Sequence, residues 1–171
     1  MRIEFENLEA SDGRFERVYQ PDELAFQDSE LELLQPVEVR GKGTRRSAEA
    51  EVRGELHTKL AIPCGRCLKP VELPIDVKFA ERFVPAVSWR DEEQHELQQE
   101  DLNLSLLVGD GIELDDLVKE EILLAIPGHV LCHEQCKGLC PTCGIDMNVA
   151  GCNCETETVD SRWAGLKDLR F

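Results

Sequence analysis

The chain has 171 residues, 42% of them hydrophobic, and a formal net charge of −16 at pH 7. This length is enough to bury a core as one domain with an appendage, and no stretch approaches the ~20 apolar residues of a transmembrane helix. The negative charge disfavours extended binding to nucleic acid, whose affinity for proteins comes largely from Lys and Arg neutralising phosphates. It favours a basic partner or a small local contact with RNA, although negative charge also promotes solubility.

The first ten residues contain three glutamates and no apolar stretch of signal-peptide length. We therefore expect a cytoplasmic protein, in a reducing compartment where cysteines rarely form structural disulfides.

Short strand patterns occupy the first part of the chain, at residues 2–8, 15–20 and 31–41. The third contains Pro36, which favours an edge strand. Residues 1–90 are therefore expected to form a small antiparallel sheet or a partly closed barrel. The densest basic group lies at residues 40–46, which we interpret as a flexible loop between strands. The alternative is a patch that contacts phosphate, with Arg40, Lys42, Arg45 and Arg46 as its basic side chains.

Residues 48–62 alternate between apolar and polar side chains, which is typical of a strand with one buried face. Gly54 interrupts the apolar side and predicts a bulge or a sharp bend. The alternation resumes at residues 71–79, so we predict a long antiparallel hairpin over residues 48–83. The two cysteines at its tip are Cys64 and Cys67.

A polar and acidic stretch at residues 88–101 is expected to be a mobile connection. After it, residues 114–126 have the apolar periodicity of a helix, with Pro127 directly after its end. This helix is expected to cover the apolar face of the sheet. Its apolar face consists of Leu114, Leu117, Val118, Ile122 and Ala125, with Leu124 close by.

These patterns predict an α+β protein in which one main helix packs on a small antiparallel β-sheet or partly closed barrel, followed by a cysteine-rich, zinc-binding segment. The expected division is residues 1–90 for the β domain, 91–110 for the acidic connection, and 111–171 for the helix, the cysteine-rich segment and a short C-terminal helix.

All eight cysteines of the chain are candidate metal ligands: Cys64, Cys67, Cys132, Cys136, Cys140, Cys143, Cys152 and Cys154. Two pairs have C-x-x-C spacing, which lets two sulfurs face one point and is typical of tetrahedral zinc sites. We therefore predict one or two bound zinc ions.

The simplest partition of the cysteines gives two sites with four sulfurs each. One site would join Cys140 and Cys143 to Cys152 and Cys154, and the other would join Cys132 and Cys136 to the hairpin tip. A rival partition places both C-x-x-C pairs in one ribbon-like site. The alternative nitrogen ligands are His129 and His133.

Both sites would be closed to substrates. A catalytic zinc keeps an open position for water, whereas four thiolates fill the coordination sphere and leave the metal a poor Lewis acid. The sequence also has no P-loop, G-x-S-x-G or G-x-G-x-x-G motif. We therefore expect a protein that is not an enzyme and has no small-molecule substrate.

The end of the chain, at residues 159–169, has the pattern of a short capped helix that docks on the protein's own core. Arg162 lies in this segment within a second basic group, and is a further candidate for contact with RNA or a partner.

Four segments together resemble the YceD family: Cys64-Gly-Arg-Cys-Leu68, residues 118–127, Cys136-Lys-Gly-Leu-Cys-Pro-Thr-Cys-Gly144 and Asp160-Ser-Arg-Trp-Ala164. These are bacterial and plastid proteins implicated in accumulation of the large-subunit ribosomal RNA. The resemblance implies a cytoplasmic, non-enzymatic factor in ribosome biogenesis, with no membrane involved. Its partner would be the precursor of the large ribosomal subunit. Because the net negative charge disfavours extended RNA binding, we expect this contact to be made chiefly through a basic ribosomal protein, or through one local patch on ribosomal RNA.

Two alternatives from other functional classes stay open. One is a thiol switch, whose C-x-x-C turns oxidise, release zinc and change partner binding. The other is a transcription-associated zinc ribbon that binds polymerase.

Overall fold

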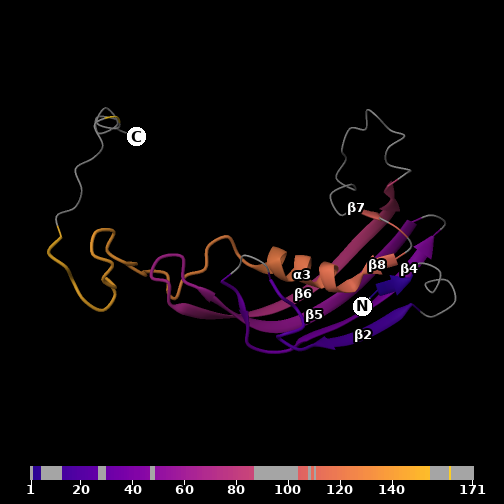
Figure 1. Cartoon of the computed structure of the whole chain (residues 1–171), viewed down its shortest axis with the longest axis horizontal. Helices are drawn as coiled ribbons and strands as arrows, with labels where there is room; N and C mark the ends of the chain where they lie inside the picture. Colours follow the sequence, from indigo (N-terminus) through magenta and orange to yellow (C-terminus); the bar gives the residue numbers. More distant parts are fainter. Residues whose placement is uncertain are drawn as a thin grey trace.

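The structure is a computed structural model and describes residues 2–4, 13–26, 30–46, 49–86, 104–107, 109, 111–154 and 162. Most of these residues belong to an open β-sheet with one helix across it (Figure 1). The predicted α+β class and antiparallel sheet are thus confirmed, and the sheet is open instead of closing into a barrel. The predicted C-terminal helix at 159–169 lies outside the described residues, except for Arg162.

The main sheet has six strands among the described residues. Five of them form a path in which β6 and β7 are parallel and all other neighbours are antiparallel, and β3 pairs separately with β5. The path runs through β2 (Arg14–Tyr19), β4 (Val37–Arg46), β5 (Glu49–Pro63), β6 (Pro70–Pro85) and β7 (Leu104–Leu107), and β3 spans Glu32–Leu33.

The long hairpin that the alternation predicts is β5 and β6. Its register runs without interruption from Ala50 opposite Phe83 to Pro63 opposite Pro70. The side chains of one parity are buried, namely Ala50, Val52, Leu56, Thr58 and Leu60. Because successive side chains of a strand point to opposite faces, the other parity forms an outer face that is turned away from the core.

The predicted bulge at Gly54 is wrong, because Gly54 pairs in regular register with both Phe79 of β6 and Gly41 of β4. The glycine is required instead by close packing. A Cβ atom at Gly54 would lie 2.6 Å from the Cζ atom of Phe79, and one at Gly41 would lie 2.5 Å from the Cζ atom of Phe15. Two aromatic rings therefore lie directly against bare backbone in the middle of the sheet.

The predicted flexible loop at residues 40–46 is also wrong, because these residues belong to β4, an inner strand between β2 and β5. The backbone of β4 pairs with β2 as far as Lys42 and with β5 as far as Arg46, and the N–H group of Gly43 additionally donates to the carbonyl of Gly13 at 2.8 Å. Pairing with two neighbours outweighs the weak strand preference of the local sequence. The strand pattern predicted over residues 31–41 is divided at Pro36 into β3 and β4.

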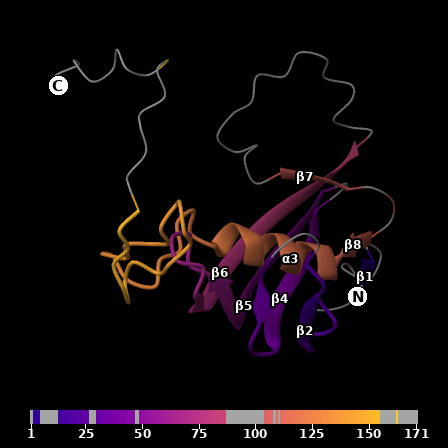
Figure 2. The same ribbon diagram turned by 60° about the vertical axis from the view of Figure 1, so that its left-hand side comes forward.

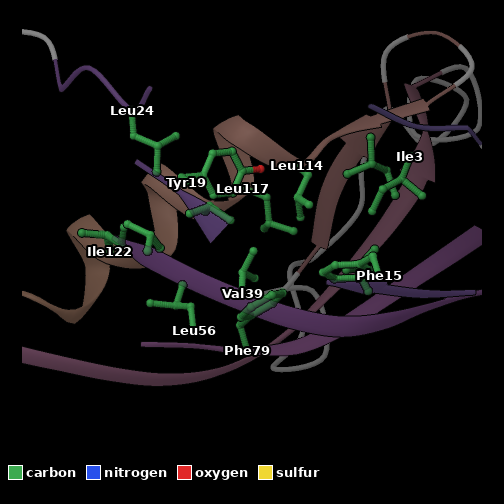
Figure 3. Packing of buried hydrophobic residues seen from close by; sticks show 14 of the residues in the cluster. Ile3, Phe15, Tyr19, Leu24, Val39, Leu56, Phe79, Leu114, Leu117 and Ile122 are labelled. Atoms are coloured by element: carbon green, nitrogen blue, oxygen red, sulfur yellow. The ribbon is translucent and has the colours of Figure 1, made fainter. Parts of the chain in front are cut away.

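The predicted helix is α3 (Leu114–Ala125), which ends before Pro127 as expected. Its buried side chains are Leu114, Leu117, Val118 and Ile122. Figure 2 shows the helix lying across one face of the sheet, and Figure 3 shows its side chains meeting Val39, Leu56 and Phe79 from the strands. Leu124 does not join this face and is 77% exposed, because it lies about 95° from the centre of the buried stripe and in the last turn.

The N-terminal strand β1 (Arg2–Glu4) pairs with β8 (Gly111–Glu113), directly before the helix. Ile3 of β1 and Ile112 of β8 belong to the same buried cluster as the sheet and helix residues. The expected connection at residues 91–110 contains β7, a strand that the sequence did not predict, while residues 87–103 lie outside the described part. The division into segments 1–90, 91–110 and 111–171 stays a prediction.

A hydrogen bond also ties the helix to the sheet. The hydroxyl group of Tyr19, at the end of β2, donates to Oδ1 of Asp115 in the first turn of α3 at 2.7 Å. Tyr19 is fully buried, and this burial together with the bond to Asp115 raises the pKa of the phenol well above its ordinary value.

Candidate metal centres

The tip of the β5–β6 hairpin is a tight turn that presents two thiols. The N–H group of Leu68 donates to the carbonyl of Cys64 at 2.9 Å, and the N–H group of Cys64 donates to the carbonyl of Lys69 at 2.8 Å. Leu68 has a φ angle of +60°, a left-handed conformation that side chains with a Cβ atom rarely adopt. This closed turn places Cys64 and Cys67 on the same side of the hairpin.

The chain that follows α3 runs beside this turn and is hydrogen-bonded to it through the backbone. The N–H group of Gly65 donates to the carbonyl of Val130 at 2.8 Å, and the N–H group of Leu139 donates to the carbonyl of Arg66 at 3.1 Å. The guanidinium of Arg66 also donates to the carbonyl of Cys136 at 2.7 Å. Figure 1 shows this contact at the end of the hairpin beyond α3. The fastening brings a second pair of cysteines to the tip.

Four sulfurs meet at this place, and we call the group the tip site: Cys64, Cys67, Cys132 and Cys136. All four sulfur atoms lie within 4.8 Å of one another. The Sγ atoms of Cys64 and Cys136 are 3.9 Å apart, and those of Cys67 and Cys132 are 3.6 Å apart. A tetrahedral zinc with Zn–S bonds of about 2.3 Å requires sulfurs about 3.8 Å apart. The spacing therefore suits a shared tetrahedral metal and is too long for disulfides.

The remaining four cysteines form a second group, which we call the local site: Cys140, Cys143, Cys152 and Cys154. Their sulfur atoms also lie within 4.8 Å of one another, and the Sγ atoms of Cys140 and Cys152 are 3.4 Å apart. All four residues come from one short stretch of chain. Unlike the tip site, this site fastens no strand of the sheet.

The C-x-x-C turn of the local site repeats the turn of the hairpin tip. The N–H group of Gly144 donates to the carbonyl of Cys140 at 2.9 Å, and the N–H group of Cys140 donates to the carbonyl of Ile145 at 2.8 Å. Gly144 has a φ angle of +73°. Both turns thus have the same two hydrogen bonds and a left-handed backbone conformation at the residue after the second cysteine. This residue is Gly144 in one turn and Leu68 in the other.

The two sites differ in their exposure to solvent. In the tip site Cys64 and Cys136 are buried, with 0% and 1% of their surface exposed, and Val71, Leu131 and Leu139 pack around them. In the local site Cys143 is exposed, and Cys152 and Cys154 are partly exposed. Solvent therefore reaches the local site more readily than the tip site.

Each group of thiols is electrostatically suited to a cation. The backbone N–H group of Cys67 lowers the pKa of Cys64 to about 6, and the backbone N–H group of Cys143 lowers that of Cys140 to about 6. Burial raises the pKa of Cys132 to about 12, and a hydrogen bond with the Cys143 thiol raises that of Cys154 to about 12. One thiolate thus forms easily in each group, but four adjacent thiolates repel one another unless a cation lies between them.

The grouping of the sulfurs is the partition that the sequence favoured, and the ribbon-like alternative is not the observed arrangement. His129 and His133 are exposed and belong to neither group. The two four-cysteine clusters are groups that can bind metal ions. That all eight cysteines do bind metal, and that the metal is zinc, stay predictions.

Sequence reasoning missed the polar residues that connect the two sites. The side-chain N–H of Asn148 donates to the sulfur of Cys136 at 3.4 Å, and its side-chain oxygen accepts from the N–H group of Lys137 at 2.8 Å. Asp146 forms an ion pair with Lys69 at 2.6 Å, which lowers the pKa of Asp146 to about 2. The available signal was Asp146-Met-Asn148 between two cysteine pairs, since Asp and Asn favour turns through such local bonds.

The basic residues that the sequence singled out are not brought to the cysteines. Arg40 and Lys42 lie in β4, with exposed side chains on the outer face of the sheet, and Arg45 in the same strand is partly buried. Arg162 is exposed, and the side chain of Arg46 lies outside the described part. Any role of these residues is therefore separate from the metal centres.

A protein-family model described as "Large ribosomal RNA subunit accumulation protein YceD" matches residues 52–170, which include all but the first residues of the long hairpin, as well as α3 and all eight cysteines. This chain belongs to the YceD family. The resemblance found in the sequence is thus confirmed over most of the chain, whereas β1 to β4 lie before the matched residues.

Individual relatives agree with membership of the YceD family. The chain is 30% identical over 156 residues to the protein YlbN of Bacillus subtilis, covering 91% of this chain and 86% of the relative. A Mycobacterium tuberculosis protein is 30% identical over 106 residues, covering 62% of this chain and 48% of the relative. The chloroplastic "Large ribosomal RNA subunit accumulation protein YCED homolog 1" of Arabidopsis thaliana is 24% identical over 166 residues, covering 79% and 49%.

No solved structure matches the chain significantly. Among the described residues, no helix has both the length and the apolar character needed to cross a membrane.

Proposed function

We propose that this YceD-family chain is a non-enzymatic, zinc-stabilised factor that supports accumulation of the large-subunit ribosomal RNA. The observation that carries the proposal is the presence of two complete four-cysteine groups in a family named for that RNA. Each group supplies as many sulfurs as a tetrahedral metal accepts, so a bound metal keeps no open position for a substrate. The sulfurs would hold the metal, and the metal would fix the shape of the surrounding chain.

Zinc is the metal that suits these groups best. Four thiolates in tetrahedral arrangement bind zinc or iron–sulfur centres, and the S···S distances of 3.4 to 3.9 Å fit a single zinc ion in each group. A cytoplasmic location is part of the proposal, because all eight cysteines are free thiols and a reducing compartment would keep them so. The proposed partner is the precursor of the large ribosomal subunit, contacted through a basic ribosomal protein or through ribosomal RNA.

The experiment is a complementation test in cells whose own gene for this protein has been deleted. We expect the ratio of large-subunit to small-subunit ribosomal RNA to fall on deletion and to return with the wild-type chain. Cys136→Ser should fail to restore the ratio, because it removes a buried ligand of the tip site. Thr142→Ser is the matched control, since it introduces serine beside the cysteines without removing a thiol. An unchanged ratio on deletion would refute the proposal.

A thiol switch is the second candidate, favoured by the exposure of Cys143 in the local site. An exposed thiolate ligand can be oxidised and can release its metal. Mild hydrogen peroxide would then release one metal ion per chain and change the ribosomal RNA ratio in cells. Retention of the metal under the same treatment would leave only the structural role.

A further inference from the structure

The outer face of the sheet, turned away from α3, carries a row of basic residues. The strand register aligns Arg14 of β2 with Lys42 of β4, and Lys42 with Arg53 of β5. All three side chains are exposed. We call these three residues the basic row. Of these residues, Lys42 was already a candidate for RNA contact from the sequence, whereas Arg14 and Arg53 were not.

No acidic residue interrupts the basic row. In the neighbouring row Glu16 lies opposite Arg40, and Arg40 lies opposite Glu55, with which it forms an ion pair. Charges there alternate and largely cancel. The basic row is thus a local concentration of positive charge in a chain with 35 acidic and 19 basic residues.

The surface around the basic row is hollowed. A shallow depression is lined by the basic row, by Arg40 and Lys78, by the carboxylates of Glu16 and Glu55, and by Phe15, Gly41 and Gly54. Gly41 and Gly54 contribute only backbone to this depression, since side chains at these positions would point to the core, where the rings of Phe15 and Phe79 lie. An elongated ligand could therefore lie against the sheet backbone between basic side chains.

The spacing of the basic row suits a phosphodiester backbone. Neighbouring strands are about 4.8 Å apart, so three residues in register span on the order of 10 Å. Each of the three cations can therefore contact a phosphate of one RNA strand that lies along the row. A basic protein would be repelled by the same row.

The net charge of −16 does not prevent such a contact. At physiological salt the Debye length is about 8 Å, so exposed charges farther away are largely screened. The carboxylate of Glu51 competes for Arg53, with which it pairs at 2.6 Å. Because both side chains are exposed, solvent and salt weaken this pair, and a phosphate can replace the carboxylate.

We propose that the basic row binds the phosphate backbone of RNA, and that it is the surface through which this chain contacts ribosomal RNA. This inference rests on the proposed function and selects RNA as the partner class at this surface. The chemistry is charge-assisted hydrogen bonding from Arg14, Lys42 and Arg53 to phosphate oxygens, which positions RNA without reading its sequence.

The test is fluorescence anisotropy of the full chain with a labelled 20-nucleotide oligouridine RNA across a series of salt concentrations. Three phosphate contacts predict a slope of about −2 for the logarithm of the binding constant against the logarithm of salt, or about a 20-fold loss between 50 and 200 mM. The triple variant Arg14→Gln/Lys42→Gln/Arg53→Gln should lose at least ten-fold in affinity and most of the slope. Glu51→Gln should bind more tightly than wild type, because it releases Arg53 from its competing partner.

The matched control is Lys59→Gln/Lys119→Gln/Lys137→Gln, which makes the same change in net charge away from the basic row and should bind as wild type does. Equal loss in both triple variants would overturn the proposal, since only total charge would then matter. Absence of RNA binding, with a basic ribosomal protein still captured after nuclease treatment, would also overturn it.

Failure of this inference is distinguishable from failure of the proposed function. If the wild-type chain restores large-subunit ribosomal RNA in deleted cells and the basic-row variant restores it equally, the basic row is overturned and the proposed function stands. If the basic-row variant fails in cells while the control triple succeeds, the inference is supported there as well. If deletion has no effect on ribosomal RNA, the proposed function fails whatever the anisotropy shows.

Discussion

At the scale of single residues, Leu68 follows the C-x-x-C pair of the hairpin tip, at the position that Gly144 occupies in the turn of the local site. Its φ of +60° places a branched side chain in the left-handed region, and the side chain is 62% exposed, so little packing offsets the strain. The cysteine spacing predicted both turns. The left-handed conformation after the second cysteine could be predicted from the sequence only at Gly144, because glycine favours it and leucine does not.

We predict that Leu68→Gly raises the free energy of unfolding by about 0.5 to 1 kcal/mol, because relief of strain exceeds the added entropy of the unfolded chain. Gly144→Ala should lower it by about 1 kcal/mol, since a Cβ atom there meets no other atom within 4 Å and only the φ of +73° opposes it. Urea denaturation of the metal-loaded protein measures both. A loss of stability in Leu68→Gly would mean that the leucine packs more than its exposure suggests.

The contact of Asn148 with the tip site could not be predicted from the sequence, because Asn148 lies outside every cysteine motif. It donates to the sulfur of Cys136 and accepts from the backbone of Lys137, so it orients one thiol of the tip site. Partners that orient metal ligands typically account for 10- to 100-fold in affinity. Asn148→Ala should therefore weaken metal binding at the tip site by about that factor.

Competition with a fluorescent chelator measures this affinity. Asn153→Ala is the matched control, because Asn153 is an exposed amide between two cysteines of the other site and should leave the tip site unchanged. Equal affinities for wild type and Asn148→Ala at the tip site would show that the contact with Cys136 is incidental.

At the scale of elements, the parts with strict periodicity were predictable and the parts held by tertiary pairing were not. The hairpin β5–β6 and α3 follow directly from period-2 and period-3.6 patterns. In contrast, β4 contains a basic, glycine-containing stretch and is a strand only because β2 and β5 pair with both of its edges. Likewise, the four residues of β7 form a strand because they pair with β6.

The partition of cysteines was predictable for a simple reason. The local site closes within one short stretch of chain, which leaves four sulfurs that only the hairpin tip and residues 132–136 supply. The two groups of cysteines could therefore be derived from spacing, whereas the basic row could not. It depends on the register of three strands, and no pattern along the chain places Arg14 beside Lys42 and Arg53.

The two cysteine turns should release metal at different rates, because Cys143 is exposed while Cys64 and Cys136 are buried. We predict two phases of equal amplitude when excess chelator is added, the faster from the local site. Cys143→Ser should abolish the fast phase, and Cys136→Ser should abolish the slow one. A single phase in wild type, or a fast phase that persists in Cys143→Ser, would contradict this assignment.

At the scale of the whole molecule, one apolar core joins the sheet to α3, and a much smaller cluster surrounds the tip site. Among the described residues, three partly buried side chains pack there with the cysteines, namely Val71, Leu131 and Leu139, so burial alone contributes little to holding this end together. The bound metal would supply the missing stability, as it does in small domains that fold only with zinc.

Removal of metal should therefore act on one end of the molecule. Amide hydrogen exchange after chelation is expected to lose protection in residues 130–154 and at the hairpin tip, while Leu56 in β5 and Val118 in α3 stay protected. Loss of protection throughout the chain would show that the core depends on the metal as well. Unchanged protection at the tip would show that the metal contributes nothing to this end.

The most direct measurement is the metal content of protein purified without chelator, combined with the number of thiols that react with an alkylating reagent before and after denaturation. We predict two zinc ions per chain, with all eight thiols protected in the native protein and all eight reactive after unfolding in chelator. One metal ion per chain with four reactive thiols, or no metal at all, would contradict the claim that both four-cysteine groups are structural metal centres.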